Sequence, residues 1–330
     1  MYTEFVIVIL GVSLILYTLL GGADFGAGII ELFTGDKGNS TVSRAMAPVW
    51  EANHMWLIIA VVILFNGFPK AYTVLSTQLH IPVLLFLVAI ILRGTAFTFR
   101  HYDAYHDYTE QFYSGIFRYS SLFAVFFLGV TISGFFGGTL SPNVEGDFLD
   151  AYVYPWLNWF SISVGVFMVV LSAYIASIFL LGEVKTDAGY QLLKRFSLRL
   201  FALSVISGLS IFLSSSYLDL QFHKVFFANS LSILLGSISV VFVPFVFYWI
   251  NKKRTWTLRF IVGAQVVLIL AGWFAVQWPN FVFYNDGSVL GILESAGPQP
   301  TMKILFIALA VGVVVIFPGL YYLFKIFKTK

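Results

Sequence analysis

The sequence predicts an all-α integral membrane protein with about nine transmembrane helices. Of its 330 residues, 59% are hydrophobic and 18% aromatic, whereas 11% are charged, which is more apolar surface than a water-soluble core of this size can bury. The apolar residues come in runs of about 20, the length that crosses a bilayer core of about 30 Å. Lysine and arginine are concentrated between alternate runs, as expected when successive spans cross in opposite directions.

Nine apolar segments have the length of a membrane span. Their approximate bounds are 5–33, 49–67, 80–99, 117–139, 156–181, 198–217, 228–250, 259–277 and 304–324. The first has no basic residue before it and no small-residue cleavage site, so we expect a retained span and not a signal peptide. The longest connections that are not apolar, 100–116 and 278–303, leave no room for a soluble domain, and we expect residues 1–330 to form a single transmembrane domain.

The connections differ sharply in basic residues. Those after the first, third, fifth and seventh spans, together with the C-terminal tail, hold 15 Lys and Arg; the others hold Lys70, Lys224 and Lys303, and Arg93 lies inside the third span. Basic residues mark cytoplasmic connections, so we expect the N-terminus outside and the C-terminus in the cytoplasm.

The chain contains no cysteine. Disulfides, thiolate metal sites and iron–sulfur clusters within it are therefore excluded, and a redox metal would need His, Met or carboxylate ligands from this chain or from a partner. The residues predict no metal site in this chain and no binding of nucleic acid.

The first three predicted spans carry ionisable residues at or near their inner ends, whereas the interiors of the other six carry none. These residues are Asp24, Glu31, Glu51, His54, Arg93 and Arg100. Within each helix they share a face, because they are spaced by seven residues in the first and third spans and by three in the second. A charge at this depth costs about 2.5–3.5 kcal/mol, so such side chains normally face the bundle interior and pair. We therefore expect a polar column, floored by Glu31 and Arg100.

Several interpretations of these residues remain open. Arg93 either reaches the inner surface, closes an ion pair with Asp24 or Glu51, or has a direct functional role. Asp24 and Glu51 either balance Arg93 or relay protons or contact a cofactor. His54 is a weak candidate for a haem ligand, because ligation by two residues would need a second His or a Met at matching depth. Gly22 and Gly26, on either side of Asp24, would let another helix backbone approach closely.

Three stretches carry a resemblance to a known family. They are GGADFGAG (21–28), APVWEANHMWLI (47–58) and ILRGTAFTFR (91–100), in this order at the first three spans. With these motifs the sequence resembles subunit II of cytochrome bd quinol oxidase. For the later spans, the likeness rests on hydropathy alone.

The resemblance implies a complex that oxidises quinol near the outer face of a bacterial or archaeal plasma membrane and reduces dioxygen to water. Two b haems and a haem d would all be ligated by subunit I, the obligate partner, so this chain is expected to ligate no cofactor. Membrane lipids, a bound quinone and a small accessory subunit are further partners that the family leaves open. The sequence does not indicate which quinol is used.

The resemblance also implies roles for individual residues. Glu51 matches an acid proposed to carry protons, Asp24 lies in the same region, and Trp56 matches the mouth of a proposed dioxygen channel. Our hypothesis is that Glu51 and Asp24, with His54 beside them, relay protons from the cytoplasm while Arg93 balances their charge.

The sequence departs from some relatives at the inner part of this route. Acidic and lysine positions near the end of the third span correspond here to Thr98 and Tyr102, so the entry of the route is open, with Asp103 or His101 as alternatives. Some relatives have Gln where His54 stands, which weakens a haem-ligand role.

Two other functions are compatible with the embedded charges. A proton- or sodium-coupled secondary transporter would use Asp24 and Glu51 as its coupling site, but it predicts broken helices in both halves and polar residues in the later spans. A scaffold that only stabilises the haem subunit predicts tolerance of substitution at every embedded charge.

Overall fold

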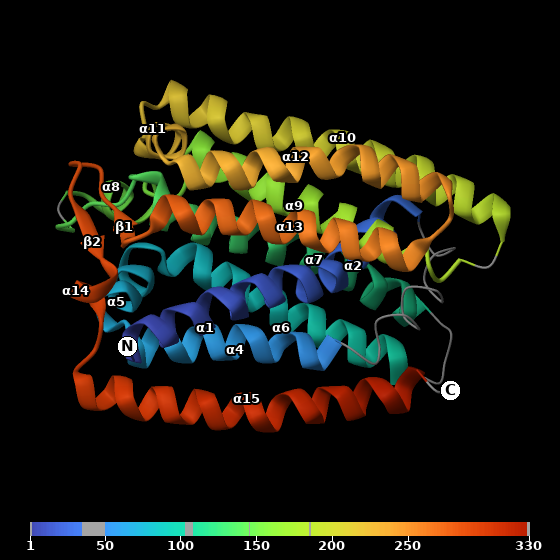
Figure 1. Cartoon of the computed structure of the whole chain (residues 1–330), viewed down its shortest axis with the longest axis horizontal. Helices are drawn as coiled ribbons and strands as arrows, with labels where there is room; N and C mark the ends of the chain where they lie inside the picture. Colours follow the sequence, from blue (N-terminus) through green and yellow to red (C-terminus); the bar gives the residue numbers. More distant parts are fainter. Residues whose placement is uncertain (1, 35–49, 103–107, 145, 185, 329–330) are drawn as a thin grey trace.

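The computed structural model describes residues 2–34, 50–102, 108–144, 146–184 and 186–328. In these ranges long helices run side by side along one axis (Figure 1). They are α1 (Tyr2–Leu16), continued by the π-helical turn η1 (Tyr17–Gly21) and α2 (Gly22–Thr34), then α4 (Trp50–Gly67), α6 (His80–Tyr102), α7 (Tyr108–Gly137), α9 (Trp159–Leu180), α10 (Asp187–Tyr217), α12 (Ser230–Asn251), α13 (Thr255–Gln277) and α15 (Gln299–Lys328).

The number of spans agrees with the prediction. Eight helices of the described chain are long and apolar enough to cross a membrane, with α1 to α2 counted as one. A ninth candidate is α4 together with α5 (Pro69–Gln78), which are bent by 111° at Phe68. Pro69 accounts for the break, because a proline disfavours helical geometry at the residue before it and begins a new helix readily.

Two helices begin earlier than predicted. α7 begins at Tyr108 and not near 117, and α10 begins at Asp187 and not near 198. Hydropathy detects only the apolar part of a helix, whereas the Thr186 side chain caps α10 by accepting a hydrogen bond from the Gly189 N–H. The added turns of α10 contain basic residues, so the prediction that the later helices are free of charge holds only for their apolar segments.

The short elements gather at the end of the bundle where the N-terminus lies, on the left of Figure 1. Besides α5 they are α8 (Phe148–Tyr152), α11 (Gln221–Ala228), β1 (Asn280–Phe283), β2 (Val289–Gly291) and α14 (Ile292–Ser295). The two strands pair antiparallel. The described chain is mostly helical, as predicted, and the connection 278–303 adds a short hairpin that was not predicted. The signal is weak because each strand is too short to show a period, although Gly287, at φ +87°, supplies the left-handed turn.

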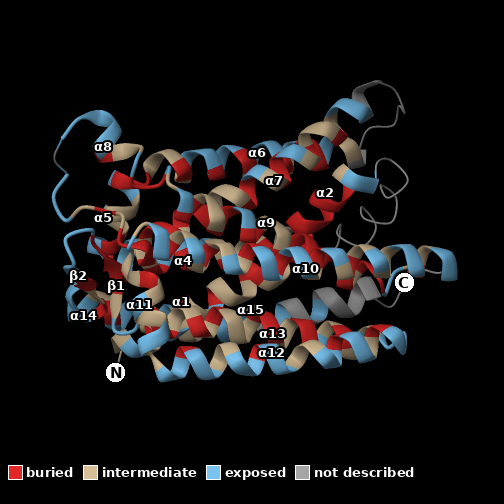
Figure 2. Ribbon diagram, turned by 90° about the horizontal axis from the view of Figure 1, so that it is seen from above, coloured by how far each residue is buried: buried red, intermediate tan, exposed pale blue. Residues whose placement is uncertain are grey.

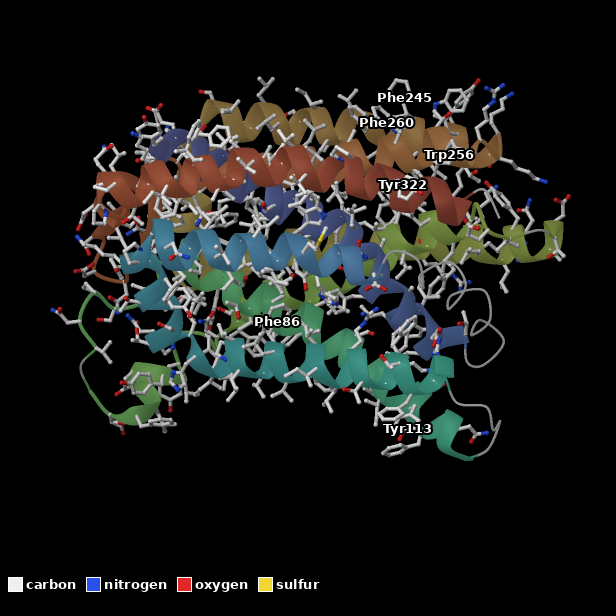
Figure 3. All side chains as sticks on the ribbon, turned by 90° about the horizontal axis from the view of Figure 1, so that it is seen from below. Phe86, Tyr113, Phe245, Trp256, Phe260 and Tyr322 are labelled. Atoms are coloured by element: carbon white, nitrogen blue, oxygen red, sulfur yellow. The ribbon has the colours of Figure 1, made fainter. Side chains whose placement is uncertain are left out.

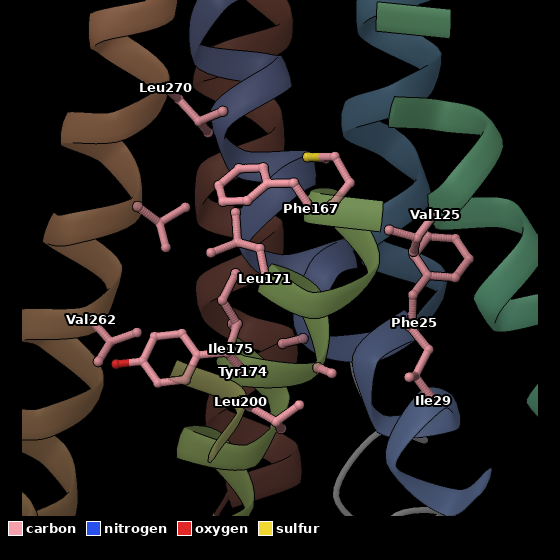
Figure 4. Packing of buried hydrophobic residues seen from close by; sticks show 14 of the residues in the cluster. Phe25, Ile29, Val125, Phe167, Leu171, Tyr174, Ile175, Leu200, Val262 and Leu270 are labelled. Atoms are coloured by element: carbon pink, nitrogen blue, oxygen red, sulfur yellow. The ribbon is translucent and has the colours of Figure 1, made fainter. Parts of the chain in front are cut away.

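α9 is the central helix, and it packs against α2, α7, α10 and α13. The buried residues of the bundle lie along these helices (Figure 2). In Figure 4, Phe167 and Leu171 of α9 lie between Leu270 of α13 on one side and Phe25 of α2 on the other. α15 lies at the periphery, where its main contacts are with α1 and α4.

The outer surface of the bundle is apolar. Large side chains such as Phe245, Trp256, Phe260 and Tyr322 project from α12, α13 and α15 (Figure 3) and are 52%, 69%, 77% and 65% exposed. A water-soluble protein rarely exposes apolar patches of this extent, whereas lipid or a partner subunit covers them in a membrane.

Candidate functional site

The first ion pair joins α2 to α6. Arg93 Nη2 donates to Asp24 Oδ1 at 2.7 Å and to the Asp24 carbonyl at 3.2 Å, and Arg93 Nε donates to Ser121 Oγ of α7 at 3.0 Å. Both charged side chains are almost completely buried, at 2% and 1% exposure. Of the ion pairs predicted for Arg93, the structure contains the one with Asp24.

The second ion pair lies further along the same helices. Arg100 holds Glu31 in a two-pronged contact, with Nη1 at 2.8 Å from Oε2 and Nη2 at 3.1 Å from Oε1. Arg118 Nε of α7 lies 3.7 Å from Glu31 Oε2. Glu31 is fully buried. Its charge is balanced by Arg100 at hydrogen-bond distance, and Arg118 adds a second, more distant positive charge. Glu31 and Arg100, the two residues predicted to floor the polar column, thus form an ion pair.

A single aromatic ring separates the two pairs. The guanidinium of Arg93 lies 4.9 Å from the centroid of Phe117, and the guanidinium of Arg100 lies 4.7 Å from it. Arg93 also lies 4.6 Å from the ring of Phe25. Each such contact is worth about 0.5–2 kcal/mol, depending on desolvation. The result is a polar column of carboxylate, guanidinium, ring, guanidinium and carboxylate between α2, α6 and α7. The Glu51 side chain, which was predicted to join it, lies outside the described residues.

Glycines of the GGADFGAG stretch bring α2 close to its neighbours. A Cβ at Gly26 would collide with the backbone carbonyl of Ser172 in α9, and a Cβ at Gly28 would lie 2.8 Å from the Cβ of Ser121. Gly28 therefore lets α7 approach closely enough for Ser121 to meet Arg93. Gly26 confirms the predicted close approach of another backbone, whereas Gly22 has ordinary contact distances of 3.4 Å or more.

The helix that carries Asp24 changes its pitch just before the ion pair. In η1 the N–H of Gly22 reaches the carbonyl of Tyr17, five residues earlier. Asn53 Nδ2 of α4 donates to the Leu20 carbonyl at 3.2 Å, which supports the widened turn. Such π turns often occur at functional sites. One inserted residue rotates the following helix by about 100° relative to α1.

The remaining predicted residues lie around this turn. The ring of His54 is 6.4 Å from that of Tyr17 and 6.1 Å from that of Phe25. Trp56 is buried in the same apolar cluster, at 7% exposure. The Glu51 backbone belongs to α4, but its side chain lies outside the described residues, as do the side chains of His101 and Tyr102 and all of Asp103.

Three residues in or beside the column, and one next to it in η1, were not predicted. Phe117, Arg118 and Ser121 come from α7, and Tyr17 begins η1, before the motif. The predicted span from 117 has no buried charge and gave no signal of its own. The available clue was position: Arg118 and Ser121 lie at the start of the predicted span 117–139, on the same side of the membrane as Arg93 and Arg100 at the end of the third span.

Haem fits poorly with the donors that this chain offers. The described residues contain no group of three or more His, Asp or Glu side chains that could hold a metal ion. His54 lies against the rings of Tyr17 and Phe25.

The arrangement can hold charge and exchange protons. Glu31 uses both carboxylate oxygens in ion pairs, whereas Asp24 uses Oδ1 alone, and its buried Oδ2 has no hydrogen-bond partner among the described residues. An oxygen in that state can accept a hydrogen bond from water or from a passing hydronium ion.

Apolar spanning helices with ion pairs buried between them define a multi-pass membrane protein that carries charge in its interior. The model of the family described as cytochrome bd terminal oxidase subunit II matches residues 2–327. The chain belongs to this family, whose members are subunits of cytochrome bd quinol oxidases.

Similar proteins extend the likeness along the chain. The cytochrome bd ubiquinol oxidase subunit 2 of Bacillus subtilis (strain 168) is 23% identical over 311 residues, which cover 91% of this chain and 88% of the relative. The cytochrome bd-I ubiquinol oxidase subunit 2 of Escherichia coli (strain K12) is 30% identical over 94 residues, 28% of this chain and 25% of the relative. The bd oxidase structure from Geobacillus thermodenitrificans has the same fold, with a TM-score of 0.79 at 20% identity over 99% of this chain and 98% of that one.

Proposed function

We propose that this chain packs against a haem-bearing subunit I, in a bacterial or archaeal plasma membrane, and carries protons toward dioxygen reduction in the complex. Two b haems and a haem d would lie in subunit I. Family membership supports the proposal, and the 15 basic residues on alternate connections favour a cytoplasmic C-terminus and an N-terminus outside.

One observation carries the proposed proton role. Asp24 is buried beside Arg93, yet one of its carboxylate oxygens is left without a described partner. Reduction of dioxygen to water consumes protons, and apolar protein conducts them only through titratable groups or ordered water. Asp24 is positioned to take a proton at Oδ2 while Arg93 keeps Oδ1 in place. Glu51 and His54, at the start of α4, are the proposed groups before it.

The dioxygen path is proposed to reach the complex along Trp56. Its indole is buried with Tyr17 and Phe25 in an apolar cluster next to the ion pair. Apolar side chains exclude water and ions but admit a small neutral gas.

The test replaces Asp24→Asn and Glu51→Gln in the complex purified with subunit I. We expect quinol oxidase turnover to fall by about a hundredfold or more, the usual scale for loss of a proton-transfer group, with haem content unchanged in the visible spectrum. Glu31→Gln is the matched control, since it also neutralises a buried, arginine-bound carboxylate, and it should retain most of the turnover.

Other outcomes would favour the competing functions. Full turnover in both Asp24→Asn and Glu51→Gln would discard the relay and leave a scaffold. A purified complex without b and d haem bands in its absorption spectrum would remove the oxidase assignment and reopen that of a coupled transporter. The chain purified without its partner should show no haem bands.

A further inference from the structure

We propose that the Tyr17 hydroxyl is the next proton-carrying group after Asp24, and that the π turn η1 builds a hydration site between them. This inference rests on the proposed proton route. It begins from three buried oxygen atoms, Tyr17 Oη, Asp24 Oδ2 and Asn53 Oδ1, that have no hydrogen-bond partner among the described residues. Tyr17 begins η1, Asp24 follows in α2, and Asn53 donates to the Leu20 carbonyl within the turn.

The three side chains are fully enclosed. Tyr17 is 2% exposed, and Asp24 and Asn53 are each 1% exposed. A buried oxygen without a partner loses about 1–3 kcal/mol, and ordered water with two to four polar partners is its usual remedy. Three such atoms on one turn and its neighbour indicate one shared water site more readily than three separate losses.

The π turn changes which residue of α2 is in line with Tyr17. In an uninterrupted α-helix, residues seven apart lie nearly in line, which would align Tyr17 with Asp24. With one residue inserted, the residue aligned with Tyr17 is Phe25, and the two rings indeed contact at 6.3 Å between centroids. Asp24, one position earlier, binds Arg93 of α6 through Oδ1, and its Oδ2 has no hydrogen-bond partner among the described residues.

The Tyr17 side chain is held in place without its hydroxyl. Its ring carbons lie 3.2 Å from the position a Cβ would take at Gly21, and its edge meets the rings of Phe25 and His54. The hydroxyl lies within electrostatic range of both Asp24 and Arg93. Packing therefore fixes the ring, and the hydroxyl is available for another task.

The proposed step conserves protons and charge. A proton held by Asp24 Oδ2 passes to the bridging water, which donates one of its own protons to Tyr17 Oη, while the hydroxyl releases its original proton to a second water of the same hydration site. Tyr17 ends neutral, with one O–H bond formed and one broken, and it never has to ionise. The proton has then moved from α2 to η1, away from Glu31 and Arg100.

Tyr17→Phe tests the step, because it removes one oxygen and keeps every ring contact. In the purified complex we expect turnover to fall at least about tenfold, with haem content and the KM for quinol unchanged, and the solvent deuterium isotope effect on turnover to increase. Tyr174→Phe is the matched control. Tyr174 lies on α9 and is also buried, with a hydroxyl that has no partner among the described residues, and its loss should leave turnover and isotope effect unchanged.

Each outcome decides something. If Asp24→Asn stops turnover while Tyr17→Phe keeps wild-type turnover and isotope effect, the proposed function stands and the role of Tyr17 is refuted. Equal losses in Tyr17→Phe and Tyr174→Phe would also refute it, since a general packing effect would then explain both. If Asp24→Asn keeps full turnover, the route through Asp24 itself is wrong.

Discussion

Removal of Arg93 should destabilise the protein more than removal of Arg100, although both arginines are buried and both hold a buried carboxylate. Side-chain exposure is 2% for Arg93 and 3% for Arg100, so solvent screening does not separate them. The difference lies in the positive charge that remains near each carboxylate after its arginine is removed. Asp24 has no second cation in the described site, whereas Glu31 keeps Arg118 at 3.7 Å.

The magnitudes follow from the contacts. Arg93→Met leaves an uncompensated buried carboxylate, a change that costs about 3–5 kcal/mol, and it also ends two cation–π contacts and the hydrogen bond to Ser121. Arg100→Met removes two charge-assisted hydrogen bonds and one cation–π contact but leaves a partly balanced Glu31. We expect a loss on the order of 1–3 kcal/mol there.

The assay is thermal unfolding of the detergent-purified complex, with haem absorption as the signal and one scan rate for all variants, since such unfolding is commonly irreversible. The Arg93→Met midpoint should lie below that of Arg100→Met. Asp24→Asn combined with Arg93→Met should recover part of the loss, because the stranded charge is gone. An Arg100→Met midpoint at or below that of Arg93→Met would refute the reasoning.

Three further predictions concern packing, pH and gas access. Gly26→Ala should abolish assembly of the haem-loaded complex, because its methyl group meets the α9 backbone, whereas Gly263→Ala, with open space around it, should assemble normally; haem content per complex measures both. Lys224 lowers the pKa of Asp219 through a hydrogen bond and its charge, so this pair stabilises the fold at pH above the unfolded pKa of the acid and stops doing so as pH falls through the folded pKa. The unfolding midpoints of wild type and Lys224→Met should therefore differ at pH 7 and converge in acid. A difference that stays constant with pH would contradict this. Trp56→Ala should raise the rate of dioxygen binding in flash measurements and leave the KM for quinol unchanged, whereas an unchanged rate would place the gas route elsewhere.

Much of the fold could be predicted because a chain that crosses a bilayer in apolar segments must form helices there. A spanning segment must satisfy its own backbone, so an apolar run of about 20 residues is a helix, and alternating basic residues count the crossings. The helix starts of α7 and α10 could not be found in this way. Their first turns are polar and extend beyond the apolar run, so their existence depends on caps such as Thr186 and not on the bilayer.

The site could be predicted only in part, for a related reason. Burying charge is so unfavourable in a membrane that Asp24, Arg93 and their inner neighbours stand out in the sequence and must pair. The π turn leaves no such mark, since YTLLG is as apolar as a regular span. The place of neutral residues such as Tyr17 and Phe117 in the site cannot be predicted either, because burying a ring or one hydroxyl in a membrane costs far less than burying a charge.

One turn of α7 determines what the two carboxylates can do. Phe117 separates the two arginines, Arg118 adds a second cation to Glu31, and Ser121 fixes Arg93 through its Nε. Glu31 is closed on both oxygens as a result, while Arg93 is held so that it reaches Asp24 with one nitrogen and leaves Oδ2 open. Two acid–arginine pairs that look equivalent in the sequence therefore differ through residues more than 80 positions away from either acid. Glu31 is therefore held as a structural ion pair, whereas Asp24 keeps one oxygen without a described partner, as the proposed relay requires.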